Sequence, residues 1–291
     1  MGGRDAAGWW CRDNDIMCSE VWWCDVSGIL WSTCIGVCLW ASLFAFLCLL
    51  LHPLFKAIEA KWPSKFENEQ QVSWLALHVQ STIHACLMAG MASYSLWDLF
   101  SADPRAQLDA PSFAFLNTKG ATARIANASH IFFCYTIVDT FVTTWRKAMT
   151  LDYFFHHMVF TSFCVLIQYH CFAGYLAGWL LVMETSTIFL NGFTFWRNRL
   201  GYDHNIVRVS FLLFGLTFFA FRLIGTIHIA YYWTKHVLQQ SVPFHGIPRW
   251  HLYVICVALV GAVVLQIFWA AGIIKNLIKT FTTDNKATKS S

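Results

Sequence analysis

The chain contains a run of 24 residues, at positions 28–51, with no charged residue and no histidine: GILWSTCIGVCLWASLFAFLCLLL. Inside a bilayer every backbone N–H and C=O group needs a partner within the protein, so only a helix or a closed barrel can cross it. A helix needs about 20 mainly apolar residues to span the hydrocarbon layer. The run therefore predicts a membrane-spanning helix, and it is too long for the apolar core of a secretory signal peptide.

The composition extends this prediction to the whole chain. Of the 291 residues, 57% are hydrophobic and 12% are charged, whereas a soluble domain has about 25% charged residues. Six further stretches are long and apolar enough to span a membrane: 72–97, 126–145, 152–170, 172–196, 206–234 and 251–274. No alternation of strands and turns indicates a barrel. The sequence predicts an all-α polytopic membrane protein with about seven transmembrane helices around a central cavity.

The Lys and Arg residues outside the spans predict how the chain is oriented. The side that holds the N-terminus has seven of them, and the opposite side has twelve. Because cytoplasmic loops carry the excess of Lys and Arg, we expect residues 1–27 to be lumenal or extracellular. Residues 28–51 then form the first transmembrane helix, and residues 276–291 form a cytosolic tail. In an oxidising compartment a disulfide can form among the three cysteines of the N-terminal segment, which are Cys11, Cys18 and Cys24.

Several predicted spans contain polar side chains that are unfavourable in hydrocarbon. An ionisable group at the centre of a membrane helix costs about 2.5–3.5 kcal/mol on insertion scales. At a rise of about 1.5 Å per residue, the residues near the midplane are His84, Glu184 and Arg222. Those in the cytosolic half are His78, Asp139, His156, His157 and Asn191. Similar depths on several helices predict a shared polar cavity that opens toward the cytosol.

The fourth span carries two adjacent histidines, His156 and His157. Neighbouring residues on a helix diverge by about 100°, so the two imidazoles face two walls of a cavity, or one faces the cavity and the other a neighbouring helix. Asp152 lies one turn before His156, and Thr161 one turn after His157, where each can hold an imidazole in one tautomer. A neutral imidazole of fixed tautomer can act as a general base near neutral pH. The alternative is that the pair caps the span at the cytosolic interface.

The fifth span places Glu184, Thr187 and Asn191 on one helix face by their spacing of three and four residues. A carboxyl group at the midplane must be protonated, hydrated or paired with a cation. Arg222 of the sixth span is the candidate partner. The pair can hold two helices together or take part in binding, and Asn191 can also serve as an interhelical hydrogen-bonding group.

The HH doublet of the fourth span, followed by the segment METSTIFLN in the fifth, resembles the TLC-domain family. Ceramide synthases, translocating-chain-associated proteins and a ceroid-lipofuscinosis protein share this membrane domain, and the resemblance covers roughly residues 70–275. It implies a bundle of helices around a long cavity. In the ceramide-synthase branch the doublet lies in that cavity and supports acyl transfer from acyl-CoA to a sphingoid amine. His156 and His157 match the doublet, so one of them would be the general base or a covalent acyl carrier.

Two departures separate the chain from true ceramide synthases. Thr161 is displaced by one position relative to the threonine that follows their doublet, and Glu184 is the one acid where they carry a histidine–aspartate segment with a second aspartate. The sequence in this respect resembles the less characterised TLC-domain-containing proteins, which are linked to phospholipid composition and lipid homeostasis.

Two functions are consistent with these residues. The first is acyl transfer from acyl-CoA, as a co-substrate, to a lipid amine or hydroxyl. The candidate catalytic residues are His156, His157, Asp139 and Asp152, and the candidate substrate-binding residues are Glu184, Arg222, Asn191, His78 and His84. The second is a non-catalytic lipid-binding or regulatory protein that controls membrane phospholipid composition. The expected partners are membrane lipids, with no bound cofactor and no metal, and family resemblance favours the endoplasmic reticulum, with the plasma membrane as the alternative.

Other classes fit the sequence less well. A net charge of +4, dispersed along the chain, does not indicate a nucleic-acid-binding protein. The third span ends in DTFVTTW, without the acidic–arginine–aromatic motif of a G-protein-coupled receptor, and the seventh span has no proline. A di-iron hydroxylase needs repeated H-x-x-H-H boxes, and only the bare HH occurs. The glycines within the spans do not indicate the broken helices of a transporter.

Overall fold

The computed structural model of the chain describes residues 26–102, 119–170, 174–238 and 249–287, which form helices and no strands. The predicted all-α fold is therefore confirmed. In chain order the helices are α2 (Val26–Leu50), α3 (His52–Lys61), the 3-10 helix η2 (Glu67–Glu69), α4 (Val72–Ala102), α6 (Lys119–Trp145), α7 (Leu151–His170), α8 (Gly174–Val182), α9 (Thr185–Leu200), α10 (Asn205–Thr217), the π-helix η4 (Phe218–Ile224), α11 (Gly225–Leu238) and α12 (Arg249–Ala287).

Within these described residues six helical stretches are long and apolar enough to cross a membrane. They are Gly28–Leu50, Val72–Leu99, Arg124–Trp145, Tyr175–Leu200, Asn205–Lys235 and Arg249–Ile278. Each matches one of the seven predicted spans. The remaining predicted span is α7, whose 20 residues lie in the same bundle and contact α6 and α12. It contains Asp152, His156 and His157, all of which line the cavity described below.

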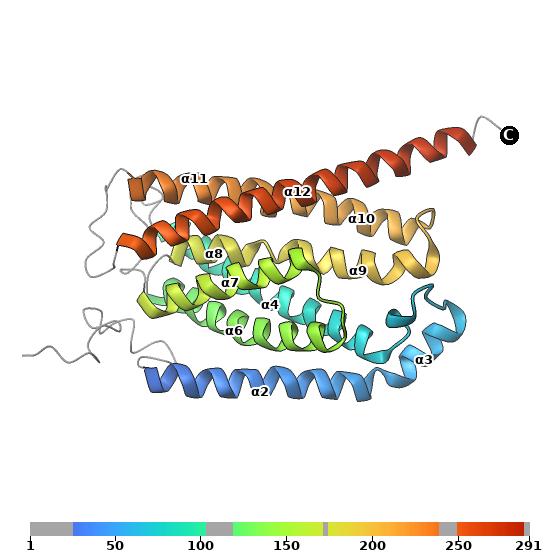
Figure 1. Ribbon diagram of the computed structural model, residues 1–291, viewed down its shortest axis with the longest axis horizontal. Helices are drawn as coiled ribbons and strands as arrows, with labels where there is room; N and C mark the ends of the chain where they lie inside the picture. The colour runs from blue at the N-terminus through green and yellow to red at the C-terminus, as the bar shows by residue number, and fades with distance from the viewer. Residues whose placement is uncertain (1–25, 103–118, 171–173, 239–248, 288–291) are drawn as a thin grey trace, which may run out of the picture.

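The long helices run side by side along one axis, with α2 at one edge of the bundle and α12 at the opposite edge (Figure 1). Only 11% of the most apolar part of α2 is buried inside the protein, compared with 61% of α6 and 61% of the α8–α9 pair. The outer faces of α2 and α12 carry exposed Leu, Ile, Val and Phe side chains, as expected of helices that face lipid. The helices α4, α6, α8 and α9 form the centre of the bundle.

A glycine allows α2 to approach α6 closely. A Cβ atom added at Gly36 would lie 2.6 Å from the Sγ of Cys134 on α6, and small residues commonly permit such approaches between membrane helices. Gln80 of α4 donates a hydrogen bond of 2.7 Å to the backbone oxygen of Trp40. These contacts fix the first transmembrane helix against the remaining bundle.

Two of the spans are not continuous α-helices. The fifth consists of α8 and α9, which are separated by Met183 and Glu184, and the sixth contains the seven-residue π-helix η4 between α10 and α11. A π-helix is rare and is often found at functional sites, because it changes the direction in which its side chains project. Arg222 belongs to η4, so both interruptions occur where the chain carries a charged residue at membrane depth.

Buried charges connect the end of α9 to α3 and η2. The Arg199 guanidinium donates to the Glu59 carboxylate, to the Glu69 backbone oxygen at 3.2 Å and to the Phe195 backbone oxygen at 3.0 Å. Its side chain is fully buried among aromatic rings, including that of Trp74 at 5.1 Å. This cluster fixes the end of α9, the helix that carries Thr187 and Asn191.

Two parts of the predicted organisation lie partly or wholly outside the described residues. The N-terminal segment 1–27 with Cys11, Cys18 and Cys24 falls almost entirely outside them, so the predicted disulfide stays a prediction. The predicted tail begins within a helix, because α12 continues through Ala287.

The buried Arg199 cluster predicts a large difference between two arginine variants. Replacing Arg199 with Ala leaves the Glu59 and Glu69 carboxylates without their cation, and breaking a buried ion pair from one side costs about 3–5 kcal/mol. Arg208 forms a 3.4 Å ion pair with Asp203 on the exposed surface, where such pairs contribute about 0–1 kcal/mol. We expect Arg199→Ala to lower the thermal midpoint of the purified protein in detergent strongly and Arg208→Ala to leave it nearly unchanged. Equal effects would show that the cluster does not hold α9 in place.

Candidate functional site

A cavity of about 820 Å³ lies within the bundle. Its walls come from α4, α6, α7, α9, α10, η4 and α12, together with Glu184 and the segment between α6 and α7. All nine residues predicted from the sequence to form the site line this cavity, although they come from five separate spans: His78, His84, Asp139, Asp152, His156, His157, Glu184, Asn191 and Arg222. The predicted shared cavity therefore exists, whereas the role of each residue stays a prediction.

One wall is formed by the buried Asp139 carboxylate of α6 and its three donors. The Tyr153 hydroxyl donates a hydrogen bond of 2.6 Å, the Tyr135 hydroxyl donates one of 3.2 Å, and the Nε2 atom of His157 lies 3.3 Å away. A carboxylate buried away from water is costly unless such partners compensate it. The three donors come from α6 and α7, so the carboxylate also joins these two helices.

His157 is engaged through both of its ring nitrogens. Its Nδ1 atom lies 2.6 Å from the Thr140 hydroxyl, which itself lies 2.6 Å from the backbone oxygen of Thr136. If the Thr140 hydroxyl donates to Thr136, Nδ1 of His157 carries a proton and donates to the hydroxyl oxygen. If the hydroxyl donates to Nδ1, the ring proton is on Nε2 and points to Asp139. In both cases the two nitrogens face groups of the protein. His157 thus has no nitrogen left to accept a proton from a substrate. The partner on Nδ1 is Thr140, and not Thr161 as the sequence suggested.

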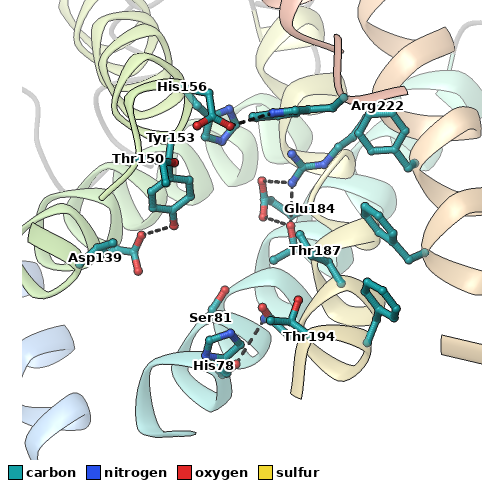
Figure 2. Close-up of a pocket in the computed structure, with 18 of the residues that line it drawn as sticks. His78, Ser81, Asp139, Thr150, Tyr153, His156, Glu184, Thr187, Thr194 and Arg222 are labelled. Carbon is teal, nitrogen blue, oxygen red and sulfur yellow. Dashed lines mark hydrogen bonds and ion pairs between the residues drawn. The ribbon is translucent and has the colours of Figure 1, made fainter. Parts of the chain in front are cut away.

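His156 differs from its neighbour in having an unpartnered nitrogen. The Nδ1 atom is buried and has no hydrogen-bond partner among the described residues. The ring lies against Phe160 and Trp269, with centroid separations of 4.5 and 5.5 Å, and its centroid is 5.9 Å from that of His157. Figure 2 shows His156 between the wall that carries Asp139 and Tyr153 and the wall that carries Glu184 and Arg222. The imidazole is therefore held by packing and lines the cavity, and its Nδ1 atom is enclosed.

Asp152 occupies the same end of the cavity but does not bond His156. Its carboxylate accepts a hydrogen bond of 3.1 Å from the Trp269 indole nitrogen. This bond joins the first turn of α7 to α12 and holds the indole beside the His156 ring. The sequence-based expectation that Asp152 orients the imidazole directly is therefore replaced by an indirect contact through Trp269.

The opposite wall contains the predicted Glu184–Arg222 pair. Arg222 Nη2 lies 3.3 Å from the Glu184 carboxylate and 2.7 Å from the Thr187 hydroxyl, while its Nε donates to the Ser186 hydroxyl at 2.6 Å. Thr187 also donates to the second Glu184 oxygen at 2.8 Å. The pairing predicted from the sequence is present, and it connects the interruption between α8 and α9 to the π-helix η4 (Figure 2).

Three further predicted residues line the α4 side of the cavity. The Asn191 side chain donates to the Thr82 hydroxyl at 3.0 Å and so connects α9 to α4. His78 places Nδ1 2.9 Å from the backbone oxygen of Trp74, which leaves its Nε2 as the acceptor. His84 is buried and stacks on the Tyr135 ring at 3.8 Å, and its Nε2 has no partner among the described residues.

Sequence reasoning missed four side chains that position the predicted site residues: Tyr135, Tyr153, Thr140 and Trp269. Tyr135 has a signal in the sequence, because it precedes Asp139 by one helical turn. The other three act across helix interfaces, and no spacing in a single sequence reveals such contacts. Among the described residues, no group of three or more His, Cys, Asp or Glu side chains is arranged to hold a metal ion.

The different bonding of the two histidines predicts different effects on stability. His157→Ala removes partners from Asp139 and Thr140, and a buried polar group left without a partner costs about 1–3 kcal/mol. His156→Ala removes no hydrogen bond through Nδ1, so we expect it to lower the stability of the protein clearly less than His157→Ala does. Thermal unfolding of both variants in the same detergent measures the difference. A larger loss for His156→Ala would contradict the bonding described here.

Comparison with known proteins identifies the family of the chain. The family model of the TLC domain matches residues 75–275, which is more than half of the chain and includes every residue of the predicted site. No curated protein and no solved structure matches the chain. The family that the sequence resembles is therefore confirmed by a match that includes all nine predicted site residues: the chain is a multi-pass membrane protein of the TLC-domain family.

Proposed function

We propose that this protein transfers an acyl group from a thioester such as acyl-CoA to the amine or hydroxyl of a lipid, with His156 as the general base. The observation that carries the proposal is the position of His156, which lines a cavity of about 820 Å³ and whose buried Nδ1 atom has no partner among the described residues. A buried polar atom without a partner is unfavourable unless a ligand or water satisfies it. A general base has to lie within hydrogen-bonding reach of the proton that it removes. Because Nδ1 is enclosed in this structure, we propose that the imidazole turns so that this nitrogen meets a ligand in the cavity.

The proposed reaction follows the usual course of acyl transfer. The lipid amine or hydroxyl attacks the thioester carbonyl carbon, and His156 accepts the proton that the nucleophile loses. The tetrahedral intermediate then collapses, the carbon–sulfur bond breaks, and the imidazolium returns the proton to the departing thiolate. The products are the acylated lipid and a free thiol, so the reaction needs no oxidant, reductant or metal.

The second histidine has a positioning role in this proposal. His157 is bonded to Thr140 and Asp139, and these contacts set the rotation of α7 about its axis. Because His156 is the adjacent residue on the same helix, that rotation determines where its imidazole points. Trp269 packs on the His156 ring from α12, and the Asp152 carboxylate fixes the indole. Asp139 and Asp152 thus act on His156 through other side chains.

The apolar part of the cavity suits an acyl chain. Its lining includes the rings of Phe132, Phe160, Phe211, Phe214 and Phe218, and ligand cavities are commonly lined by aromatic and aliphatic side chains with a few polar groups. We propose that the acyl chain lies against these rings with its carbonyl carbon near His156. We also propose that the protein lies in the membrane of the endoplasmic reticulum and that the cavity opens to the cytosolic side. Soluble thioesters in the cytosol could then enter the cavity.

A non-catalytic role in lipid binding is the second candidate, and one observation favours it. The ionic groups of both walls are satisfied within the protein, since Arg222 binds Glu184, Thr187 and Ser186 and Asp139 binds two tyrosines and a histidine. Among the described residues that line the cavity, no charged group except those near the opening then remains to stabilise a developing oxyanion. A protein that only held a lipid would need no such group.

Comparative lipidomics distinguishes the two candidates. Cells that express the wild type, His156→Ala or the control His228→Ala are compared at matched protein levels. His228 bonds the Tyr175 hydroxyl at 3.2 Å and does not line the cavity. We expect the wild type and His228→Ala to shift one acylated lipid class. His156→Ala should lose at least about a hundredfold in the rate of that change, the lower end of what a general base contributes.

Purified protein then tests the reaction directly. With labelled palmitoyl-CoA and a membrane-lipid extract, the wild type should release free thiol and form a labelled lipid, and His156→Ala should do neither. If His156→Ala shifts lipids as the wild type does, the imidazole is not the base, and the lipid-binding function becomes the better account.

A further inference from the structure

Three cations line the opening of the cavity at the end where α6 and α9 end. Arg146 lies in the segment between α6 and α7, Arg197 lies on α9 and Lys275 lies on α12. Positive residues gather at the cytosolic ends of membrane helices for topological reasons alone. These three differ from an ordinary surface cluster in that they come from three separate elements and line one cavity.

The acidic side chains that line the cavity already have partners within the protein. Asp152 is the acidic residue of the cavity lining at the start of α7, and its carboxylate accepts the Trp269 indole N–H. Lys275 forms no ion pair among the described residues. Arg197 bonds the neutral Asn198 side chain at 3.2 Å and lies over the Phe193 ring. The opening therefore has an excess of positive charge, which suits an anionic group.

One side of the opening is continuous with the outer surface of α12. Phe268 lines the cavity and is also 66% exposed, and Gly272 and Lys275 both line the cavity and are exposed. A Cβ atom added at Gly272 would meet nothing within 4 Å. The outer surface of α12 nearby carries exposed apolar side chains such as Val264 and Ile274. A molecule in the surrounding lipid can thus reach the cavity past Gly272, beside the Asp152–Trp269 contact.

We propose that a membrane phospholipid occupies this cavity, with its phosphate held at the opening by Arg146, Arg197 and Lys275 and an acyl chain among the inner phenylalanines. Arginine and lysine bind phosphate oxygens through charge-assisted hydrogen bonds, which are stronger than neutral ones. The composition of the site suits an amphiphile, because the same cavity is lined by cations for a phosphate and by phenylalanine rings for an acyl chain. The claim that this phospholipid is the acyl acceptor rests on the acyl transfer proposed above. Its binding to the cavity can be tested without any turnover.

The phosphate could be supplied by a bilayer lipid or by a soluble acyl thioester such as acyl-CoA. The exposed side of the cavity along α12 favours the bilayer lipid. A lipid can reach the cavity along this apolar surface, whereas a soluble thioester arrives from water and does not need such a route. The two sources share the same phosphate chemistry, so the experiment has to separate them.

Photolabelling of the full-length protein in a phosphate-free detergent tests the proposal. One probe is phosphatidylethanolamine with a diazirine on an acyl chain, and the other is diacylglycerol with the same acyl chain and no phosphate. We expect the phospholipid to label the protein at about tenfold lower concentration than diacylglycerol, which corresponds to about 1.4 kcal/mol. The double variant Arg197→Gln, Lys275→Gln should remove this difference and leave the labelling by diacylglycerol unchanged.

Two glycines of α12 provide a matched pair for the route of access. Gly272→Leu places a side chain in the open space beside the cavity and should reduce labelling by both probes. A Cβ atom added at Gly261 would also meet nothing within 4 Å, but Gly261 does not line the cavity. Gly261→Leu should therefore leave labelling by both probes unchanged. Normal thermal midpoints for both variants show that the fold is intact.

Two results would overturn the proposal. Equal labelling by the two probes, or full labelling of the double variant, would show that no phosphate site exists at the opening. Competition by palmitoyl-CoA at lower concentrations than unlabelled phosphatidylethanolamine would identify a soluble thioester as the source of the phosphate. Labelling as proposed with a fully active His156→Ala variant would leave the phosphate site in place and disprove only the acyl transfer.

Discussion

The need to satisfy ionic groups at membrane depth determines how this bundle is built. An isolated charge in hydrocarbon is unfavourable by several kcal/mol, and the structure compensates each one by contacts from another segment of the chain. Asp139 receives donors from α6 and α7. Arg222 receives acceptors from Glu184 and the start of α9. Each compensated charge therefore also fixes the relative position of two helices, and the two clusters form the facing walls of the cavity.

The irregular parts of two spans follow from the same need. A regular helix through residues 218–224 would project its side chains in a different direction from the π-helix η4, which directs Arg222 to the Glu184 carboxylate. The break between α8 and α9 places Glu184 just before the first turn of α9, where Thr187 donates to it. Local departures from α-helical geometry are thus used to bring charges together, and the space between the walls remains open to a ligand.

Much of the fold was predictable from the sequence, because the length and apolarity of each span are properties of one segment. The shared cavity was predictable for a related reason: depth in the membrane follows from position along a helix, so His84, Glu184 and Arg222 could be placed at one level before any contact was known. The contacts that give the histidines different roles were not predictable. Thr140 with His157 and Trp269 with Asp152 meet across helix interfaces, and the rotation of each helix about its axis depends on packing against all its neighbours. The π-helix was missed as well, since residues 218–224 show the same apolar pattern as the α-helices beside them.

Two adjacent histidines acquire distinct roles because a helix turns by about 100° at each residue. His157 faces the joint between α6 and α7, where Asp139 and Thr140 occupy both of its nitrogens. The same rotation directs His156 into the space between the walls, where Phe160 and Trp269 hold the ring without bonding its buried nitrogen. In the doublet, the histidine that joins α6 to α7 therefore also fixes the direction of its neighbour, which lines the cavity.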